Sequence, residues 1–220
     1  MPKRFDDDLN KLKRDVLAMG AVAEGMIRKA MAALVDRDPA LIKDVLADED
    51  RLDEFQRAID NETVRLIGVY TPVAGDLRIL LMITRINAEL ERIGDQAVTI
   101  CYGYESLKLI EEPPLKPLVD LPRMAGIAEG MLHRALEAFL NSSEGDAEVV
   151  IGTDDQVDRL NDQIFRELLT YMLGDPRNIS RSLGLILTAR AFERVADHAV
   201  NIAEDVVYIV RGEDIRHVKG

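Results

Sequence analysis

The chain has 220 residues, 47% of them hydrophobic and 31% charged, which predicts a globular protein of one large or two small domains. Its net charge of −12 argues against nucleic acid as a partner, because phosphate binding needs a surplus of Lys and Arg. A single cysteine, Cys101, excludes an internal disulfide, fits a reducing compartment and is expected to be a buried apolar residue. No secretory signal or membrane span is predicted, so we expect any membrane association to go through a partner.

Three helices are predicted in the first half of the chain, over residues 5–36, 39–70 and 73–107. Apolar residues of the first alternate steps of four and three for more than four heptads. Asp38 and Pro39 predict an N-cap and first position for the second helix, and Thr71-Pro72 the turn after it. The expected inward positions are Phe5, Leu9, Leu12, Val16, Met19, Ala23, Met26, Ala30 and Ala33, then Leu41, Val45, Leu52, Phe55, Ile59, Leu66 and Val69, then Ile79, Met82, Ile86, Leu90, Ile93, Ala97 and Ile100.

The second half of the chain repeats the first. AEGM at 23–26 recurs at 128–131, an offset of 105, and the offset falls to 102 after the second helix because the turn there is shorter. Residues 108–122 carry four of the eight prolines and are typical of a linker, although Pro122 could already open the next helix. We therefore predict an all-α fold with six long helices in two tandem antiparallel three-helix bundles, residues 1–110 and 122–220, joined by a proline-rich linker over 111–121.

One acidic motif is written in both halves. Residues 91–100 read ERIGDQAVTI and residues 193–202 read ERVADHAVNI, with six of ten positions identical. Each copy places a Glu and an Asp four residues apart on one helix face, where like charges repel. The preceding helix of each half carries a second such pair, and equal distances from the turn predict that the two pairs are level. The four pairs are Glu49 with Asp53, Glu91 with Asp95, Asp154 with Asp158, and Glu193 with Asp197.

Two level sets of four carboxylates predict sites for hard or borderline cations such as Mg²⁺, Mn²⁺, Ca²⁺ or iron, in which bridging carboxylates could hold several ions. The helix wheel turns these pairs away from the apolar seams, so we expect the sites on the outer surface of the bundles. The alternative is that all four pairs are solvated acidic faces. Glu24 and Glu129, in the repeated AEGM, are weaker candidates at about the same height.

Four other polar residues have open roles. His133 and His198 are more often solvated than metal-ligating at such helical positions. Arg92 and Arg194 directly follow the Glu of each motif. A salt bridge that neutralises the acidic cluster is the favoured role for these arginines, and contact with phosphate is the second.

The sequences ERIGDQAVTI and ERVADHAVNIAEDVVY, with the opening RFDDDLNKLKRDVLAMG, resemble the PhoU family over residues 5–212. The resemblance implies multinuclear metal clusters held by E/D-x-x-x-D motifs, which match the four pairs above, with Fe, Mn, Zn or Mg as the metal. It also implies a cytoplasmic regulator, not an enzyme, that couples a phosphate ABC transporter to a phosphate-sensing histidine kinase and represses the phosphate-starvation response. A homodimer is compatible with this resemblance. Asn201, where the first half has Thr99, joins the expected metal ligands, and we then expect the two sites to differ in affinity or nuclearity.

Two competing functions remain open from the sequence. An all-α Mg-dependent nucleotide pyrophosphatase also uses helix carboxylates, but its acidic pairs face an enclosed pocket with Lys or Arg beside it. A structural adaptor without metal would bind a basic partner directly through its acidic faces. No catalytic or cofactor-binding residue is predicted beyond the metal ligands.

Overall fold

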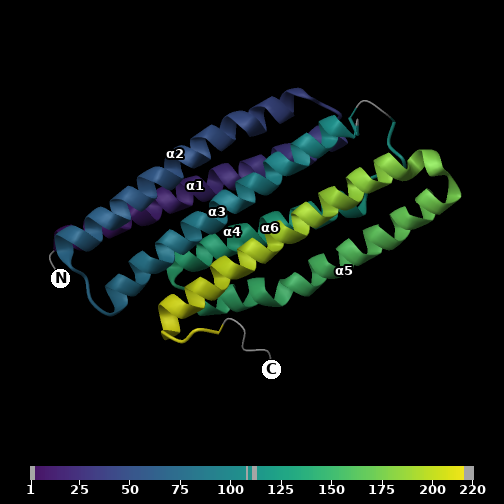
Figure 1. Ribbon diagram of the computed structural model, residues 1–220. Helices are drawn as coiled ribbons and strands as arrows, with labels where there is room; N and C mark the ends of the chain where they lie inside the picture. Colours follow the sequence, from purple (N-terminus) through teal and green to yellow (C-terminus); the bar gives the residue numbers. More distant parts are fainter. Residues whose placement is uncertain (1–2, 108, 111–112, 216–220) are drawn as a thin grey trace.

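The computed structural model describes residues 3–107, 109–110 and 113–215, and within these it contains six long helices and no strand (Figure 1). None of the helices it describes is long and apolar enough to cross a bilayer. The elements are α1 (Lys3–Val35), α2 (Ala40–Tyr70), α3 (Gly75–Ser106), α4 (Asp120–Asn141), α5 (Glu144–Gly174), the short 3-10 helix η1 (Pro176–Asn178) and α6 (Ile179–Arg211).

The predicted helix bounds in the first half are correct to within two residues. Pro39 is the N-cap of α2 rather than its first residue, and Asp38 instead accepts a hydrogen bond from the Ala40 N–H at 2.9 Å. In the second half, α4 begins at Asp120, inside the segment predicted as linker. Pro122 therefore lies in the first turn of α4, where its missing N–H has no helical partner to lose.

The apolar seam predicted for α1 is buried along its whole length, from Phe5 to Ala33. The seam of α2 is only partly as predicted, since Val69 is 62% exposed and Ile42 is buried in place of Leu41. This difference follows from helix geometry, because a straight helix of 3.6 residues per turn drifts away from a strict seven-residue repeat. Cys101 is buried and free, as predicted.

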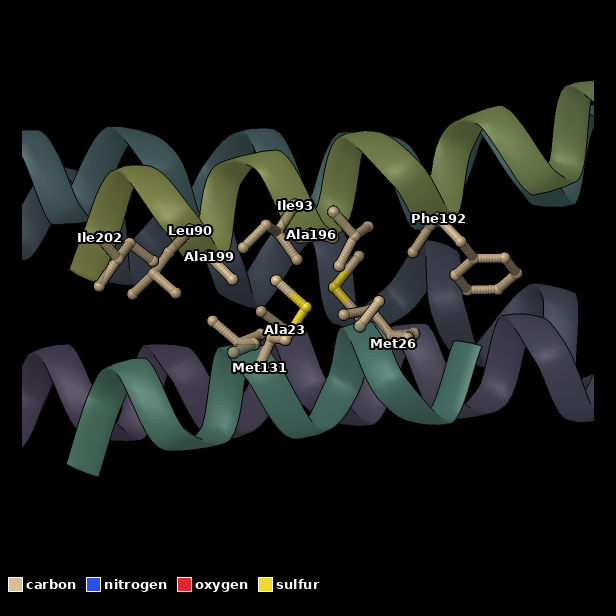
Figure 2. Close-up of a cluster of buried hydrophobic side chains, with 14 of the residues drawn as sticks. Ala23, Met26, Leu90, Ile93, Met131, Phe192, Ala196, Ala199 and Ile202 are labelled. Carbon is tan, nitrogen blue, oxygen red and sulfur yellow. The ribbon is translucent and has the colours of Figure 1, made fainter. Parts of the chain in front are cut away.

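The two three-helix bundles lie side by side and share one continuous core. Helix α1 contacts α4 and α3 contacts α6, while α2 and α5 lie on opposite outer sides (Figure 1). Figure 2 shows side chains from both halves meeting in one cluster, with Met26 of α1 and Met131 of α4 facing Ile93 and Phe192. The shared core is thus formed by α1 and α3 of the first repeat and by α4 and α6 of the second.

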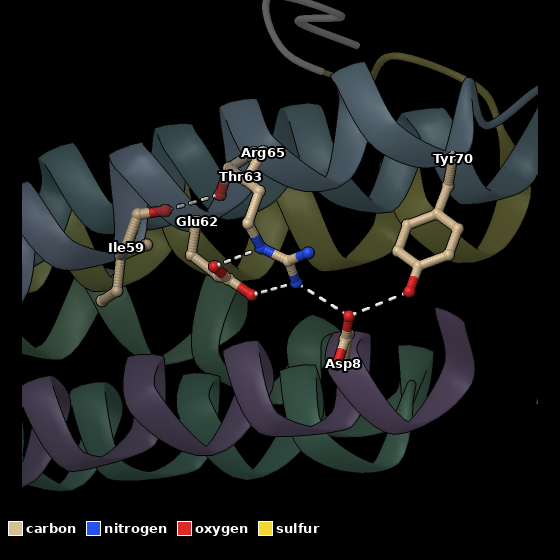
Figure 3. A network of polar contacts seen from close by, with 6 residues as sticks. All are labelled: Asp8, Ile59, Glu62, Thr63, Arg65 and Tyr70. Carbon is tan, nitrogen blue, oxygen red and sulfur yellow. Dashed lines mark hydrogen bonds and ion pairs between the residues drawn. The ribbon is translucent and has the colours of Figure 1, made fainter. Parts of the chain in front are cut away.

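Polar contacts hold α2 against α1 at the two positions where acidic residues interrupt its seam. Arg65 of α2 donates to Asp8 of α1 at 2.7 Å and to Glu62 at 2.6 Å (Figure 3). The second interruption, Asp48, is 7% exposed and accepts from Lys29 of α1 at 2.6 Å. Asp48 is thus paired directly with α1, whereas Glu62 is paired within α2 with Arg65, which itself reaches Asp8 of α1.

Candidate metal centre

The first set of predicted carboxylates lies where α2 and α3 run past each other. Glu49, Asp53 and Glu91 are half-buried, and Asp95 is exposed. Burial raises the pKa of Glu49 above its ordinary value, and the charges on Asp53 and Asp95 raise it further. Burial likewise raises the pKa of Glu91, with added repulsion from Asp95 and Asp53. Acids on each helix therefore raise the pKa of acids on the other, as expected for pairs at the same height.

Close helix packing at Gly94 positions this first set. Gly94 lies on α3 between Glu91 and Asp95, and a Cβ atom on it would meet Leu52 of α2. The absence of a side chain lets the two helix backbones approach at the height of the carboxylates. At the equivalent positions the second half has Ala196 and Val157, both fully buried, so a larger residue on α6 is matched by a smaller one on α5.

The second set lies on α5 and α6, and its carboxylates are also partly desolvated and repel one another. Burial raises the pKa of Asp154 to about 6, and the charges on Asp158 and Asp197 add to this. Burial and the charge of Asp158 also raise the pKa of Asp197. Asp154 and Glu193 are half-buried, whereas Asp158 and Asp197 are exposed.

Positive charge is scarce around these eight carboxylates. Only Asp53 makes an ion pair within 4.0 Å among the described residues, with Arg57 at 3.7 Å. More distant arginines, Arg92 and Arg194, lower the pKa of Glu91 and Asp197 by weaker electrostatic attraction. Partly desolvated, mutually repelling carboxylates without a close counter-charge suit a bound cation, and an all-oxygen donor set suits a hard one.

The side chains are not yet gathered around a common centre. Across residues 3–107, 109–110 and 113–215, no group of three or more His, Cys, Asp or Glu side chains is placed so that it could hold one ion. The helices bring the carboxylates to the same height, and ligation would require the side chains to change rotamer. The predicted ligand roles of these eight residues therefore stay predictions.

Asn201, the ninth predicted ligand, is engaged elsewhere. Its side-chain amide donates to Glu89 Oε2 of α3 at 3.0 Å, and His198 Nδ1 lies 2.7 Å from the same oxygen. Burial alone would raise the pKa of Glu89, but the contacts with His198 and Asn201 hold it below its ordinary value. Glu89 links the two bundles. It was not identified from the sequence, because its partners His198 and Asn201 lie in the other half and no local spacing indicates these contacts.

The two AEGM glutamates form a reciprocal pair of contacts between α1 and α4. Glu24 lies 3.1 Å from His133 Nδ1, and Glu129 accepts from Arg28. Since 28 and 133 are equivalent positions in the repeat, the same contact is made once in each direction. These glutamates thus join the bundles, and their proposed role as metal ligands stays a prediction.

The two motif arginines differ although their sequence positions are equivalent. Arg92 donates to Glu89 at 2.9 Å, so it neutralises an acid outside the predicted set. Arg194 makes no ion pair within 4.0 Å with a described residue and lines a groove between α3 and α6.

Comparison with known proteins places this architecture in a described family. A family of sequences described as the PhoU domain matches residues 16–102 and again 121–206, one match in each half. The chain is 37% identical over 217 residues to the phosphate-specific transport system accessory protein PhoU homolog of Pseudomonas aeruginosa, covering 98% of this chain and 89% of that protein. It is 35% identical to the accessory protein of the same name from Escherichia coli, over 99% of this chain and 89% of that one.

Solved structures show the same fold. The crystal structure of PhoU from Pseudomonas aeruginosa superposes with a TM-score of 0.90, at 37% identity, over 95% of this chain and all of that one. The phosphate transport system regulatory protein PhoU from Streptococcus pneumoniae superposes with a TM-score of 0.86 over 96% of this chain, and at 24% identity this likeness concerns the fold alone.

Proposed function

Because this chain belongs to the PhoU family, we propose that it is a regulatory accessory protein of phosphate transport and not an enzyme. In this proposal it couples a phosphate ABC transporter to a phosphate-sensing histidine kinase in the cytoplasm and represses the phosphate-starvation response. The observation that carries it is similarity over nearly the whole chain to proteins named for a phosphate-specific transport system.

Metal binding is part of the proposal. The residues that would hold the ions are the two level sets, Glu49, Asp53, Glu91 and Asp95, and Asp154, Asp158, Glu193 and Asp197. A bound cation would neutralise carboxylates that now repel one another, and would so change the charge of the outer face in each bundle. The all-oxygen donor set supports iron, manganese or magnesium, and carboxylates that bridge ions would allow clusters.

The pyrophosphatase alternative is less well supported by the geometry. Its acidic pairs should face an enclosed pocket, whereas the side chains of these pairs are half-buried or exposed. An acidic, two-lobed helical surface suits binding to a basic face of a partner, and association driven by such charges weakens as salt rises. A homodimer would be compatible with this use of the surface.

The experiment is a pull-down of the transporter ATPase subunit and of the sensor kinase, with and without chelator, at low and physiological salt. We expect at least one partner to be retained, less so with chelator or in an Asp95→Ala/Asp197→Ala variant. An Asp44→Ala/Glu137→Ala variant is the matched control, since it removes two exposed acids outside the aligned pairs. Retention of neither partner under any condition would overturn the proposal and favour a nucleotide hydrolysis assay.

A further inference from the structure

A groove of about 700 Å³ lies between α3 and α6, at the boundary of the two bundles. Its wall combines apolar residues such as Leu187 and Ala191 with Gln96, Thr99, Arg190 and Arg194. None of the predicted metal ligands lines it, so it is separate from the sites described above. Its volume is within the range of pockets that hold small organic ligands.

The internal repeat shows which side chain lies at the equivalent place in the other half. In the other half, the carboxylate of Glu89 fills the equivalent space and is contacted by three side chains: Arg92 at 2.9 Å, His198 at 2.7 Å and Asn201 at 3.0 Å. The residue equivalent to Glu89 is Ala191, which ends at its Cβ atom. The first half thus has the carboxylate of Glu89 at this place, whereas the second half has an open groove beside Ala191.

The residues that would surround the missing carboxylate are still present. Arg194 is equivalent to Arg92, Gln96 to His198 and Thr99 to Asn201, and all three line the groove. Gln96 Oε1 is buried without a hydrogen-bond partner in the described part of the chain, so it can accept from a hydroxyl group of a ligand, whereas the Gln96 amide NH2 is the donor that could reach an anion. Arg194 lacks a close ion pair there, as noted above. A carboxylate or phosphoryl group in the groove would take the place that Glu89 occupies in the other half.

A second cation favours a doubly charged group. Arg190 lies one helical turn before Arg194, on the same face of α6, and also makes no ion pair within 4.0 Å with a described residue. Its counterpart in the first half is Ala88, which is uncharged. Two guanidinium groups and neighbouring hydrogen-bond donors are the usual means of binding a phosphoryl dianion.

The groove also contains one acid, Glu105, which repels an anion at its own end. Glu105 lies on the last turn of α3, opposite the start of α6. Across the antiparallel pair it is about six residues, or about 9 Å along the helix axis, from the level of Arg190. The phosphoryl group therefore belongs at the arginine end, and the apolar wall with Tyr102 is left for the organic part of the ligand.

We propose that this groove binds a phosphorylated small molecule of about nucleoside-monophosphate size, with its phosphoryl group held by Arg190 and Arg194 in the position that Glu89 fills in the other bundle. This binding goes beyond the proposed regulatory function, and it is measured without any transporter or kinase. Failure of the pull-down above would therefore leave it standing, and its own failure would leave the regulatory proposal standing.

The test is calorimetric titration of the full chain with AMP, adenosine and inorganic phosphate, in the presence of chelator so that no metal at the acidic sets holds the phosphate. We expect AMP to bind, inorganic phosphate to bind at least about tenfold more weakly, and adenosine not to bind. Arg190→Ala/Arg194→Ala should weaken AMP binding at least about tenfold, and since both side chains are exposed, the variant should fold. Ala191→Glu, which introduces a carboxylate at the position equivalent to Glu89, should also abolish binding.

Arg92→Ala is the matched control, because it removes the equivalent arginine beside the filled site and should change AMP affinity less than about twofold. Several results would overturn the proposal: no binding of AMP to the wild type, equal binding by the double arginine variant, or adenosine binding as well as AMP. Phosphate binding as tightly as AMP would overturn the assignment of the apolar wall to an organic group.

Discussion

Leu52 of α2 fills the space beside Gly94 of α3, where a Cβ atom would lie 2.2 Å from Leu52 Cδ2. The contact lies inside the first set of carboxylates, since Leu52 precedes Asp53 and Gly94 precedes Asp95. The second half solves the same packing problem with Ala196 and Val157, both fully buried. The distance between α2 and α3 at the candidate metal site is thus set by one pair of apolar positions.

Gly94→Ala should destabilise the fold by about 1–3 kcal/mol, because the added methyl overpacks a buried contact. Adding Leu52→Val should recover part of the loss, since this recreates the combination found in the second half. Urea denaturation followed by circular dichroism measures both effects. Gly68→Ala on α2 has no atom within 4 Å of the new Cβ and should be neutral or stabilising, by up to about 1 kcal/mol. Equal effects at 94 and 68 would contradict the packing argument.

Asp154 should make the metal-free protein less stable at neutral pH than at mildly acidic pH. Its pKa in the folded state is about 6, above its ordinary value of 3.8, so folding favours the protonated acid. The penalty is therefore complete above about pH 6 and disappears as the pH falls below 3.8. After allowance for solvent screening, Asp154→Asn should raise the free energy of unfolding at pH 7 by about 1 kcal/mol without metal.

Urea titrations at pH 7 and pH 5 check this, and the gain should shrink at the lower pH. Asp155→Asn is the control, because Asp155 is an exposed neighbour whose contact with Arg159 is 4.0 Å long. If the two variants were equally stable at pH 7, the penalty assigned to the burial of Asp154 and to its repulsion by neighbouring acids would be wrong.

His198→Ala should weaken the link between the bundles. It leaves Glu89 half-buried with fewer partners, at an expected cost of about 1–2 kcal/mol in the free energy of unfolding. The pKa of Glu89 is below its ordinary value of 4.5, so its contribution is present at neutral pH and is lost as the pH falls below that value. His133→Ala removes the exposed contact with Glu24 and should cost less than about 0.5 kcal/mol.

Thermal unfolding of the two histidine variants at pH 7 makes the comparison directly. A loss at position 198 no larger than at position 133 would show that the Glu89 contacts do not stabilise the interface.

Cys101 should resist alkylation in the folded protein. Burial raises the pKa of its thiol to about 12, so almost none is thiolate at pH 8, and the side chain is fully buried. Reaction with iodoacetamide, followed by mass spectrometry, should be at least about a hundredfold slower in buffer than in 6 M guanidinium chloride. Rapid labelling of the native protein would mean that α3 opens often enough to expose residue 101.

Much of the fold could be predicted because the repeat and the heptads are local signals. The seam from Phe5 to Ala33 needs only the helical period, and the paired carboxylates were placed level by counting residues from each turn. The buried face of α2 is harder to predict. The slow drift between 3.5 and 3.6 residues per turn moves this face around the helix, so that Ile42 is buried near one end and Val69 is exposed near the other.

The contacts between the bundles could not be predicted from such signals. Glu89 and His198 lie on different halves, and no spacing in the sequence reveals that α3 packs against α6. For the same reason Asn201 was expected at the metal, whereas its amide contacts Glu89. The different contacts of Arg92 and Arg194 follow from Glu89 and Ala191, which the offset of 102 residues makes equivalent, but only the packing of α3 against α6 shows the groove beside Arg194.

Metal content of the purified protein tests the account most directly. The wild type should bind iron, manganese or magnesium in each half, as measured by elemental analysis after loading and gel filtration. Asp95→Ala should remove the metal of the first half, Asp197→Ala that of the second, and the double variant nearly all of it, with helicity unchanged because both residues are exposed. The Asp44→Ala/Glu137→Ala control should keep the wild-type content. The same metal stoichiometry in the Asp95→Ala/Asp197→Ala variant as in the wild type would contradict the assignment of these motifs as the metal sites.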